Sequence, residues 1–261
     1  KVMVVGGGVA GCEAARVLAI RGHKPVLFEK TGQIGGNLIP GGAPSFKEDD
    51  IALAKWYARQ MEILGVEVHM NTEVTKEMVL AGDYDSVIIA TGSTPKVFKL
   101  GDDDKVYTAA EVLTGEKDPG NQTVIVGGGL VGLELALDLA EKGKDVTVVE
   151  ALDKLLAVNG PICSANKEML LELIPFKGVR TVCGAKVTGY KDGQLSYEKD
   201  GAAASIPADS VILAVGYREE KSLYEQLQFE VPDIYLLGDA KNVSNIMYAI
   251  WDAFEVANHL D

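Results

Sequence analysis

The residues best suited to chemistry form one pattern that occurs twice in the chain. The first copy, Val4-Val5-Gly6-Gly7-Gly8-Val9-Ala10-Gly11, leads to Glu29, and the second, Ile125-Val126-Gly127-Gly128-Gly129-Leu130-Val131-Gly132, leads to Glu150. Glycines let a phosphate approach the backbone, and a helix that begins at such a turn presents unpaired N–H groups to it. A carboxylate after the next strand can accept hydrogen bonds from ribose hydroxyls. Each copy therefore predicts a dinucleotide site.

The individual positions have distinct expected roles. Gly6 and Gly8 leave the path of a pyrophosphate clear, and Gly11 lets the helix pack tightly on the strand. At about 4 Å, Glu150 would repel a 2'-phosphate by about 1 kcal/mol in water and about 4 kcal/mol at a partly shielded site. The second copy is therefore predicted to prefer NADH to NADPH. The alternative interpretation of each copy is a glycine-rich turn followed by a solvated glutamate.

A second repeat indicates the elements that position these turns. Residues 85–92, Asp-Ser-Val-Ile-Ile-Ala-Thr-Gly, are closely matched by residues 209–216, Asp-Ser-Val-Ile-Leu-Ala-Val-Gly. Each is typical of a buried strand that ends in a glycine turn. Each half thus opens with strand, turn, helix and strand, and closes with a core strand. The predicted fold class is α/β, with two Rossmann-like doubly wound units.

The end of the chain sets the predicted domain order. A strand at residues 234–237 stops at Gly238-Asp239, and an amphipathic helix follows from about Asn245. Because this strand and helix have no partners of their own, they are assigned to the first unit. The second unit is then an insertion. The predicted domains are residues 1–113 with 218–261, and residues 114–217.

Charge and composition exclude several classes of partner. The 261 residues have a net charge of -13 and no run of basic residues, which disfavours nucleic acid and anionic membrane surfaces. The three histidines lack metal-ligand spacing, and the three cysteines form no CxxC pair. Cys12 begins a predicted helix, where either a packed side chain or a thiol of lowered pKa is possible. We expect a cytoplasmic protein without a bound metal.

With both repeats placed, the chain resembles the flavoprotein reductases that have two dinucleotide-binding domains. The resemblance implies FAD in the first unit and NAD(P)H in the inserted unit. Asp239 would bind a ribityl hydroxyl, Asn37 would lie beside the isoalloxazine, and Glu134 near the nicotinamide. The implied FAD residues are Gly6, Gly8, Val9, Ala10, Gly11, Glu29, Lys30, Gly36, Asn37, Ala90, Thr91, Gly92, Gly238, Asp239, Ile246 and Met247. The implied NAD(H) residues are Gly127, Gly129, Leu130, Val131, Gly132, Glu134, Glu150 and Gly216.

A closer resemblance is to the C-terminal half of old yellow enzyme-like NADH:flavin oxidoreductases, which include 2-enoate reductases and 2,4-dienoyl-CoA reductase. It is carried by four segments, at residues 34–38, 46–48, 65–68 and 249–257. In that group the reductase half follows a TIM barrel that carries FMN and an iron-sulfur cluster. The sequence contains neither a barrel nor cluster cysteines. The resemblance therefore implies a fragment, or a separately produced domain, whose electron acceptor is such a barrel.

The expected function follows from that resemblance. NADH would pass a hydride to FAD, and electrons would leave to an acceptor outside this chain. Cofactors carry this chemistry, so no catalytic side chain is predicted. Two alternatives stay open: a nucleotide-binding structural domain without turnover, and a free-standing NADH oxidase or ferredoxin-type reductase.

Overall fold

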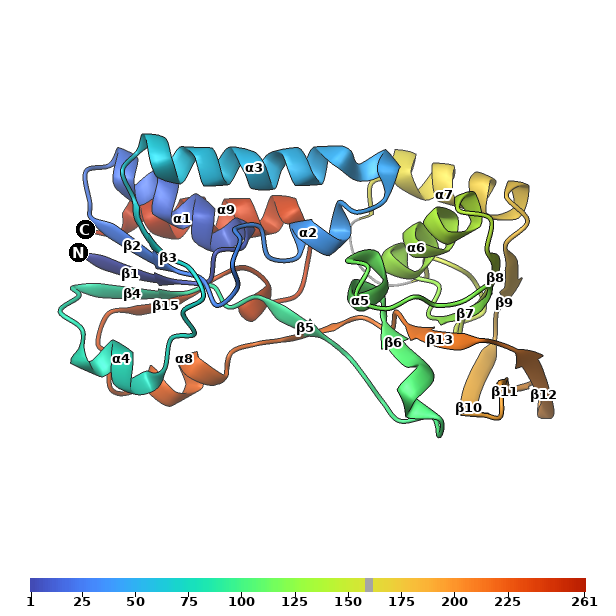
Figure 1. The fold of residues 1–261 in the computed structure, drawn as a ribbon. Helices are drawn as coiled ribbons and strands as arrows, with labels where there is room; N and C mark the ends of the chain where they lie inside the picture. The colour runs from blue at the N-terminus through green and yellow to red at the C-terminus, as the bar shows by residue number, and fades with distance from the viewer. Residues whose placement is uncertain (158–161) are drawn as a thin grey trace. The chain divides into compact units, whose positions relative to one another are not determined.

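The chain forms two compact units. A computed structural model describes residues 1–157 and 162–261 (Figure 1). The first unit comprises residues 1–42, 47–94 and 217–261, and the second comprises residues 43–46 and 95–216. The predicted α/β fold class is confirmed.

The first unit is built on a parallel sheet of five strands in the order β15-β4-β1-β2-β3. The strands are β1 (Val2–Val5), β2 (Pro25–Phe28), β3 (Glu67–His69), β4 (Ser86–Ile89) and β15 (Ile234–Leu236). Figure 1 shows α1 (Val9–Ile20), α3 (Glu48–Ile63) and α9 (Ile246–His259) on one face, and α4 (Lys76–Ala81) and α8 (Ser222–Leu227) on the other. Shorter elements are α2 (Leu38–Gly41) and η3 (Gly238–Ala240), whereas η1 (Ser45–Lys47) lies across the division between the two units.

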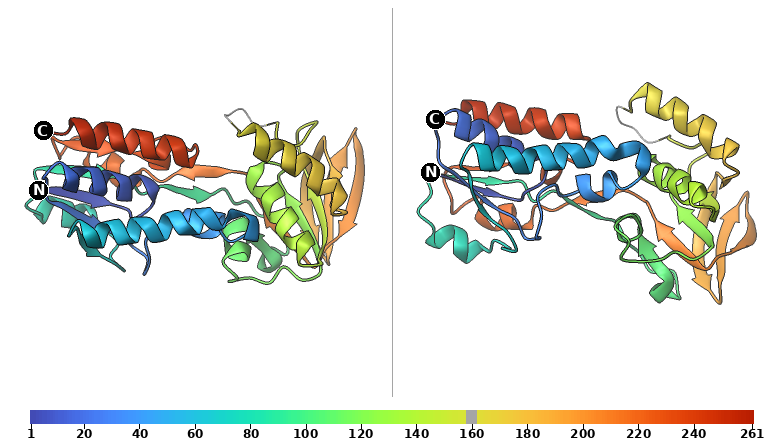
Figure 2. Two further views of the ribbon diagram at one scale, coloured as in Figure 1. Left: turned by 90° about the horizontal axis from the view of Figure 1, so that it is seen from above. Right: turned by 45° about the horizontal axis from the view of Figure 1, so that its top comes forward.

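The second unit repeats the sheet order, β6-β13-β7-β8-β9, again with every pair parallel. Its strands are β6 (Val106–Thr108), β7 (Gln122–Val126), β8 (Asp145–Val149), β9 (Arg180–Val182) and β13 (Ser210–Leu213). Its helices are η2 (Asp103–Lys105), α5 (Ala109–Leu113), α6 (Leu130–Glu141) and α7 (Ser164–Phe176). An antiparallel sheet adds β10 (Ala185–Lys191), β11 (Gln194–Lys199) and β12 (Ala202–Pro207). The views in Figure 2 show α6 and α7 together, apart from β10–β12.

Both sheets are covered on both faces, which explains their continuous apolar strands. In β1, Val2 and Val4 pack towards α1, α3 and α9, whereas Met3 and Val5 pack towards α4 and α8. In the second unit the helices cover one face of the sheet and β10–β12 cover the other. This burial fixes the ends of the strands, where the glycine turns lie.

The structure corrects the predicted domain boundary. Residues 95–113 were predicted in the first unit, but β6 pairs in parallel with β13 and α5 packs on α6, so this stretch belongs to the second unit. The chain passes between the units at β5 (Ser93–Pro95) and β14 (Tyr217–Glu219), which pair with each other. The boundary depends on a strand pairing about a hundred residues apart, which no local pattern indicates.

Candidate functional site

The glycines of the first turn differ in what surrounds them. Gly6 has a φ of +108°, and a Cβ there would lie 2.3 Å from the Ala90 carbonyl oxygen. A Cβ on Gly11 would lie 1.9 Å from the Gly6 carbonyl oxygen. A Cβ on Gly8 would meet nothing closer than the Gly36 Cα at 4.0 Å. Gly6 and Gly11 are therefore required by the packing of the chain itself, and Gly8 is the open position.

The second turn has the same division of roles. A Cβ on Gly127 would lie 2.3 Å from the Ala214 carbonyl oxygen, and one on Gly132 would lie 2.0 Å from that of Gly127. A Cβ on Gly129 would have no neighbour within 4 Å. The first glycine of each copy was predicted to leave the path of a pyrophosphate clear. In the structure it is also required by the close approach of the neighbouring strand.

The two fingerprint helices begin without a side-chain cap. Gly8 and Gly129 are the N-cap residues of α1 and α6, and neither helix has an acidic residue in its first turn. By contrast, Thr75, Thr108 and Asn245 cap α4, α5 and α9 with side-chain oxygens. The first N–H groups of a helix have no intrahelical acceptor. At α1 and α6 these donors and the positive end of the helix dipole suit an anion.

The two predicted ribose carboxylates lie against the turns. Glu29 is buried and accepts hydrogen bonds from the Gly7 N–H at 2.7 Å and from the Thr31 N–H and hydroxyl, each at 2.7 Å. Glu150 accepts from the Gly128 N–H at 2.5 Å and the Leu152 N–H at 2.7 Å. A carboxylate has about four lone-pair sites, so capacity for ribose hydroxyls remains. These backbone and hydroxyl donors were not predicted from the sequence.

In each unit a loop after the second strand returns to the turn. The Gly35 N–H donates to the Gly7 carbonyl at 2.9 Å, and the Leu156 N–H donates to the Gly128 carbonyl at 2.9 Å. Gly36 has a φ of +52°, and a Cβ there would lie 3.1 Å from the Gly8 Cα. The loop that contains the predicted residues 36 and 37 is thereby held directly over the first turn.

A polar network joins further predicted residues in the first unit. The Asn37 Nδ2 donates to the Ser93 hydroxyl at 3.4 Å, and that hydroxyl donates to the Asp239 Oδ2 at 3.0 Å. The Ser244 N–H donates to the Asp239 Oδ1 at 3.0 Å. Ser93 and Ser244 were not predicted. For Ser93 the available signal was its position directly after the Ala-Thr-Gly turn.

The neighbouring backbone is also anchored. The Gly238 N–H donates to the Asp252 Oδ2 at 2.9 Å, and a Cβ on Gly238 would lie 2.7 Å from the Ala10 Cβ. The predicted turn at residues 90–92 is held because the Thr91 hydroxyl donates to the Glu220 carbonyl and the Glu220 N–H donates to the Gly92 carbonyl at 2.9 Å. Residues from four distant segments therefore meet at the carboxyl ends of β1 and β4.

The remaining predicted residues are placed as follows. Ile246 and Met247 begin α9, where the Asn245 Oδ1 accepts the Tyr248 N–H at 3.0 Å. The side chain of Lys30 is exposed. In the second unit Leu130 and Val131 form the first turn of α6. The side chain of Glu134 is buried and accepts a hydrogen bond from the Asn166 Nδ2 at 3.1 Å. The Gly216 carbonyl accepts a hydrogen bond from the Lys96 N–H at 2.9 Å.

Cys12 is a packed residue. Its side chain is fully buried, and its Sγ donates to the Gly7 carbonyl at 3.2 Å. Burial raises the pKa of the Cys12 thiol, and the nearby carboxylates of Glu29 and Glu13 raise it further. Of the two interpretations of this cysteine, the structure supports packing.

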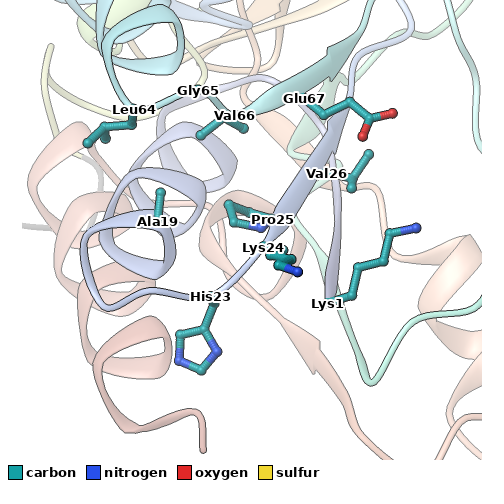
Figure 3. A pocket seen from close by; sticks show the side chains of 10 residues that line it. All are labelled: Lys1, Ala19, His23, Lys24, Pro25, Val26, Leu64, Gly65, Val66 and Glu67. Carbon is teal, nitrogen blue, oxygen red and sulfur yellow. The ribbon is translucent and has the colours of Figure 1, made fainter.

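One pocket in the described parts of the chain lies away from the turns. It has a volume of about 400 Å³ and is lined by residues at the starts of β2 and β3, among them Lys24, Pro25 and Glu67 (Figure 3). Ligands of open α/β sheets bind at the carboxyl ends of the strands. This pocket lies at the opposite end and is not part of the candidate site.

Within residues 1–157 and 162–261 no cluster of three His, Cys, Asp or Glu side chains is arranged to hold a metal ion. Within the same ranges no helix has the length and apolar character needed to cross a membrane.

Two parallel sheets, each with a dinucleotide-type glycine turn after its central strand, define a two-unit nucleotide-binding fold. The family model described as pyridine nucleotide-disulphide oxidoreductase matches residues 1–253, and the chain belongs to this family. Proteins of this family bind FAD and NAD(P)H. The family resemblance inferred from the sequence is confirmed.

Curated relatives are longer proteins. The chain is 47% identical to cinnamate reductase of Clostridium sporogenes over 260 residues, which cover 100% of this chain and 39% of the relative. It is 35% identical to NADH oxidase of Thermoanaerobacter brockii over 265 residues, which cover 98% of this chain and 40% of the relative. The chain therefore spans about two fifths of the length of these relatives. Cinnamate is a 2-enoate, so the closer resemblance is confirmed as well.

Solved structures of oxidoreductases are similar to this chain over nearly its whole length. A 2-naphthoyl-CoA reductase complex superimposes with a TM-score of 0.92 at 28% identity, covering 100% of this chain and 40% of that one. The thioredoxin reductase of T. acidophilum superimposes with a TM-score of 0.77 at 22% identity, covering 98% and 96%. The second likeness shows the fold alone.

Proposed function

We propose that this chain is an electron-transfer module that passes a hydride from NADH to FAD and passes electrons on to an acceptor outside the chain. The observation that carries the proposal is the pair of turns that each combine an open glycine, an uncapped helix and a fixed glutamate. One turn supports one dinucleotide, so two support a donor and an acceptor.

The first unit is the proposed FAD site. Its turn suits a pyrophosphate, because Gly8 is open and α1 is uncapped. Glu29 supplies the ribose acceptor, and Asn37 and Asp239 are held together beyond it by Ser93. Bound FAD would supply the ring that accepts a hydride. The chain's own residues bind and orient it, and no side-chain acid or base is assigned.

The second unit is the proposed NADH site. Gly129 and the start of α6 provide the phosphate position, and Glu150 provides an acceptor for ribose hydroxyls. A 2'-phosphate would meet the charge of Glu150, which supports NADH over NADPH.

The acceptor is proposed to be a separate domain that carries FMN and an iron-sulfur cluster, as in 2-enoate or dienoyl-CoA reductase-like enzymes. Support comes from the length of the relatives, because this chain covers only 39% of cinnamate reductase. A second candidate is an NADH oxidase activity, favoured by the 35% identity to a protein of that name.

Anaerobic titration with NADH tests the proposal. The chain is loaded with FAD, and the visible flavin absorbance is recorded before and after NADH is added. Bleaching by NADH, and weaker bleaching by the same concentration of NADPH, is the expected result. A flavin-loaded protein whose spectrum ignores NADH would instead support a structural domain without turnover. Readmitting oxygen then separates the candidates, since sustained NADH consumption by the isolated chain indicates an oxidase.

A further inference from the structure

Ser93 is the centre of the polar network in the first unit. It follows the Ala-Thr-Gly turn at the end of β4, and its hydroxyl lies between Asn37 and Asp239. These partners come from positions 56 and 146 residues away in the sequence. A single hydroxyl therefore connects the loop over the first glycine turn with the segment that precedes α9.

The direction of each hydrogen bond in this network is fixed by chemistry. An ionised carboxylate can only accept, so the single proton of the Ser93 hydroxyl goes to Asp239. The hydroxyl must then accept from Asn37, which makes Nδ2 the amide atom that faces it. The amide oxygen of Asn37 is consequently turned away from Ser93.

The carboxylate of Asp239 is oriented at both oxygens. Its Oδ2 accepts from the Ser93 hydroxyl, and its Oδ1 accepts from the Ser244 N–H in the segment before α9. Tyr217 lies close enough for interaction with this charge: burial raises the pKa of its phenol, and Asp239 raises it further. The partly buried environment of the bond between Ser93 and Asp239 makes it electrostatically stronger than it would be in water.

The duplicated strand gives a comparison for this position. Ser93 follows Gly92 as Tyr217 follows Gly216 in the second copy. Tyr217 belongs to the first unit, so the second copy has no serine at this position and its next residue is part of the other unit. The network is thus an addition to the first copy of the repeat and not part of the shared dinucleotide turn.

We propose that Ser93 is a positioning residue of the flavin site, which sets the carboxylate of Asp239 and the amide of Asn37 in the orientations that FAD requires. This inference rests on the proposed function, because it takes the first unit as the FAD site. Ser93 acts through its two partners.

Removal and restoration of the hydroxyl test the proposal. In Ser93→Ala the FAD dissociation constant is expected to rise about tenfold, the cost of one hydrogen bond to a charged group. The visible spectrum of bound flavin is expected to shift as well. Ser93→Thr keeps a hydroxyl and is expected to return the dissociation constant to within about threefold of wild type. Thermal unfolding of the FAD-free proteins reports any general loss of stability.

Thr75→Ala is the matched control. Thr75 also belongs to the first unit, and its hydroxyl caps α4 by accepting the Met78 N–H. Its loss is expected to lower the melting temperature of the FAD-free protein while the FAD dissociation constant stays at the wild-type value. Ser93→Ala is expected to show the reverse pattern.

A double-mutant cycle with Asp239→Ala shows whether Ser93 acts through Asp239. If it does, adding Ser93→Ala to Asp239→Ala changes the FAD dissociation constant by less than about twofold. Full additivity, or wild-type FAD affinity in Ser93→Ala, would overturn the inference. Wild-type protein that binds FAD but ignores NADH refutes the proposed function and leaves this affinity test intact. Wild-type protein that binds no FAD overturns both.

Discussion

The two units share a sheet order and a turn but differ in what surrounds the turn. In both, the first and last glycines of the fingerprint are fixed by contacts within the chain, and the middle one of the three is open. Only the first unit adds the network at Ser93, joined to a strand and helix from the end of the chain. The common turn thus provides generic dinucleotide binding, and the added segments make one site different from the other.

The edge strands illustrate the same difference. The sheet of the first unit is completed by β15, which follows the second unit in the chain, whereas that of the second unit is completed by β6, which precedes its turn. The edge strand β15 leads directly to Asp239, and β6 leads to α5. Equivalent positions in two similar sheets therefore deliver different groups.

The largest expected effect comes from Gly11→Ala and Gly132→Ala. Each new Cβ would lie within 2.0 Å of a carbonyl oxygen, so each variant is expected to lose about 3 kcal/mol of unfolding free energy. Urea denaturation followed by circular dichroism measures the loss. Cofactor binding should distinguish the two variants. Gly11→Ala is expected to lose its flavin, and Gly132→Ala is expected to keep a flavin that NADH does not bleach. Equal effects on both cofactors would contradict the assignment of the units.

The next largest effects are expected from Gly8→Ala and Gly129→Ala. Neither Cβ meets a protein atom closer than 4.0 Å, so stability should change by less than about 0.5 kcal/mol. Affinity for FAD in the first variant, and for NADH in the second, should fall at least about tenfold, because the methyl group occupies the phosphate approach. Titration calorimetry of each cofactor checks this. Unchanged affinity in both would show that phosphate does not approach these glycines.

Glu150→Gln should have a smaller effect on the second unit alone. The amide keeps an acceptor for the Gly128 N–H but removes the charge that repels a 2'-phosphate. The ratio of kcat/KM for NADH to that for NADPH is expected to fall about tenfold, with flavin content unchanged. Glu29→Gln is the matched control, since it should weaken FAD retention and leave the ratio as in wild type. A ratio that responds to both variants would contradict separate sites.

Cys12→Ala should give the smallest effect. Cys12 occupies the position of Leu133 in the second unit, and its thiol donates to the Gly7 carbonyl beneath the first turn. Loss of this weak bond and a small packing volume should cost about 1 kcal/mol, measured by urea denaturation. NADPH discrimination should not change. A loss above about 3 kcal/mol would show that the thiol has a larger structural role than packing.

Much of the fold was predictable because local sequence patterns indicate its strands, turns and helix starts. Residues 4–11 and 125–132 show an apolar strand, a glycine turn and a helix start, and the Asp-Ser-Val-Ile repeat marks the closing strands. The domain boundary was not predictable. The short strand β6 carries no signal for its partner, and its assignment follows from pairing with β13 far along the chain.

The candidate site was likewise only partly predictable from the sequence. Two dinucleotide turns, their glycines and the glutamates after them were determined by the sequence, because glycine spacing and a strand-terminal carboxylate are local properties. The packing role of Gly11 was predicted as well, but only the tertiary structure decided that Gly6 also serves internal packing while Gly8 faces open space. It alone brought Ser93 between Asn37 and Asp239, because hydrogen bonds between residues this far apart depend on how the strands β4 and β15 pair.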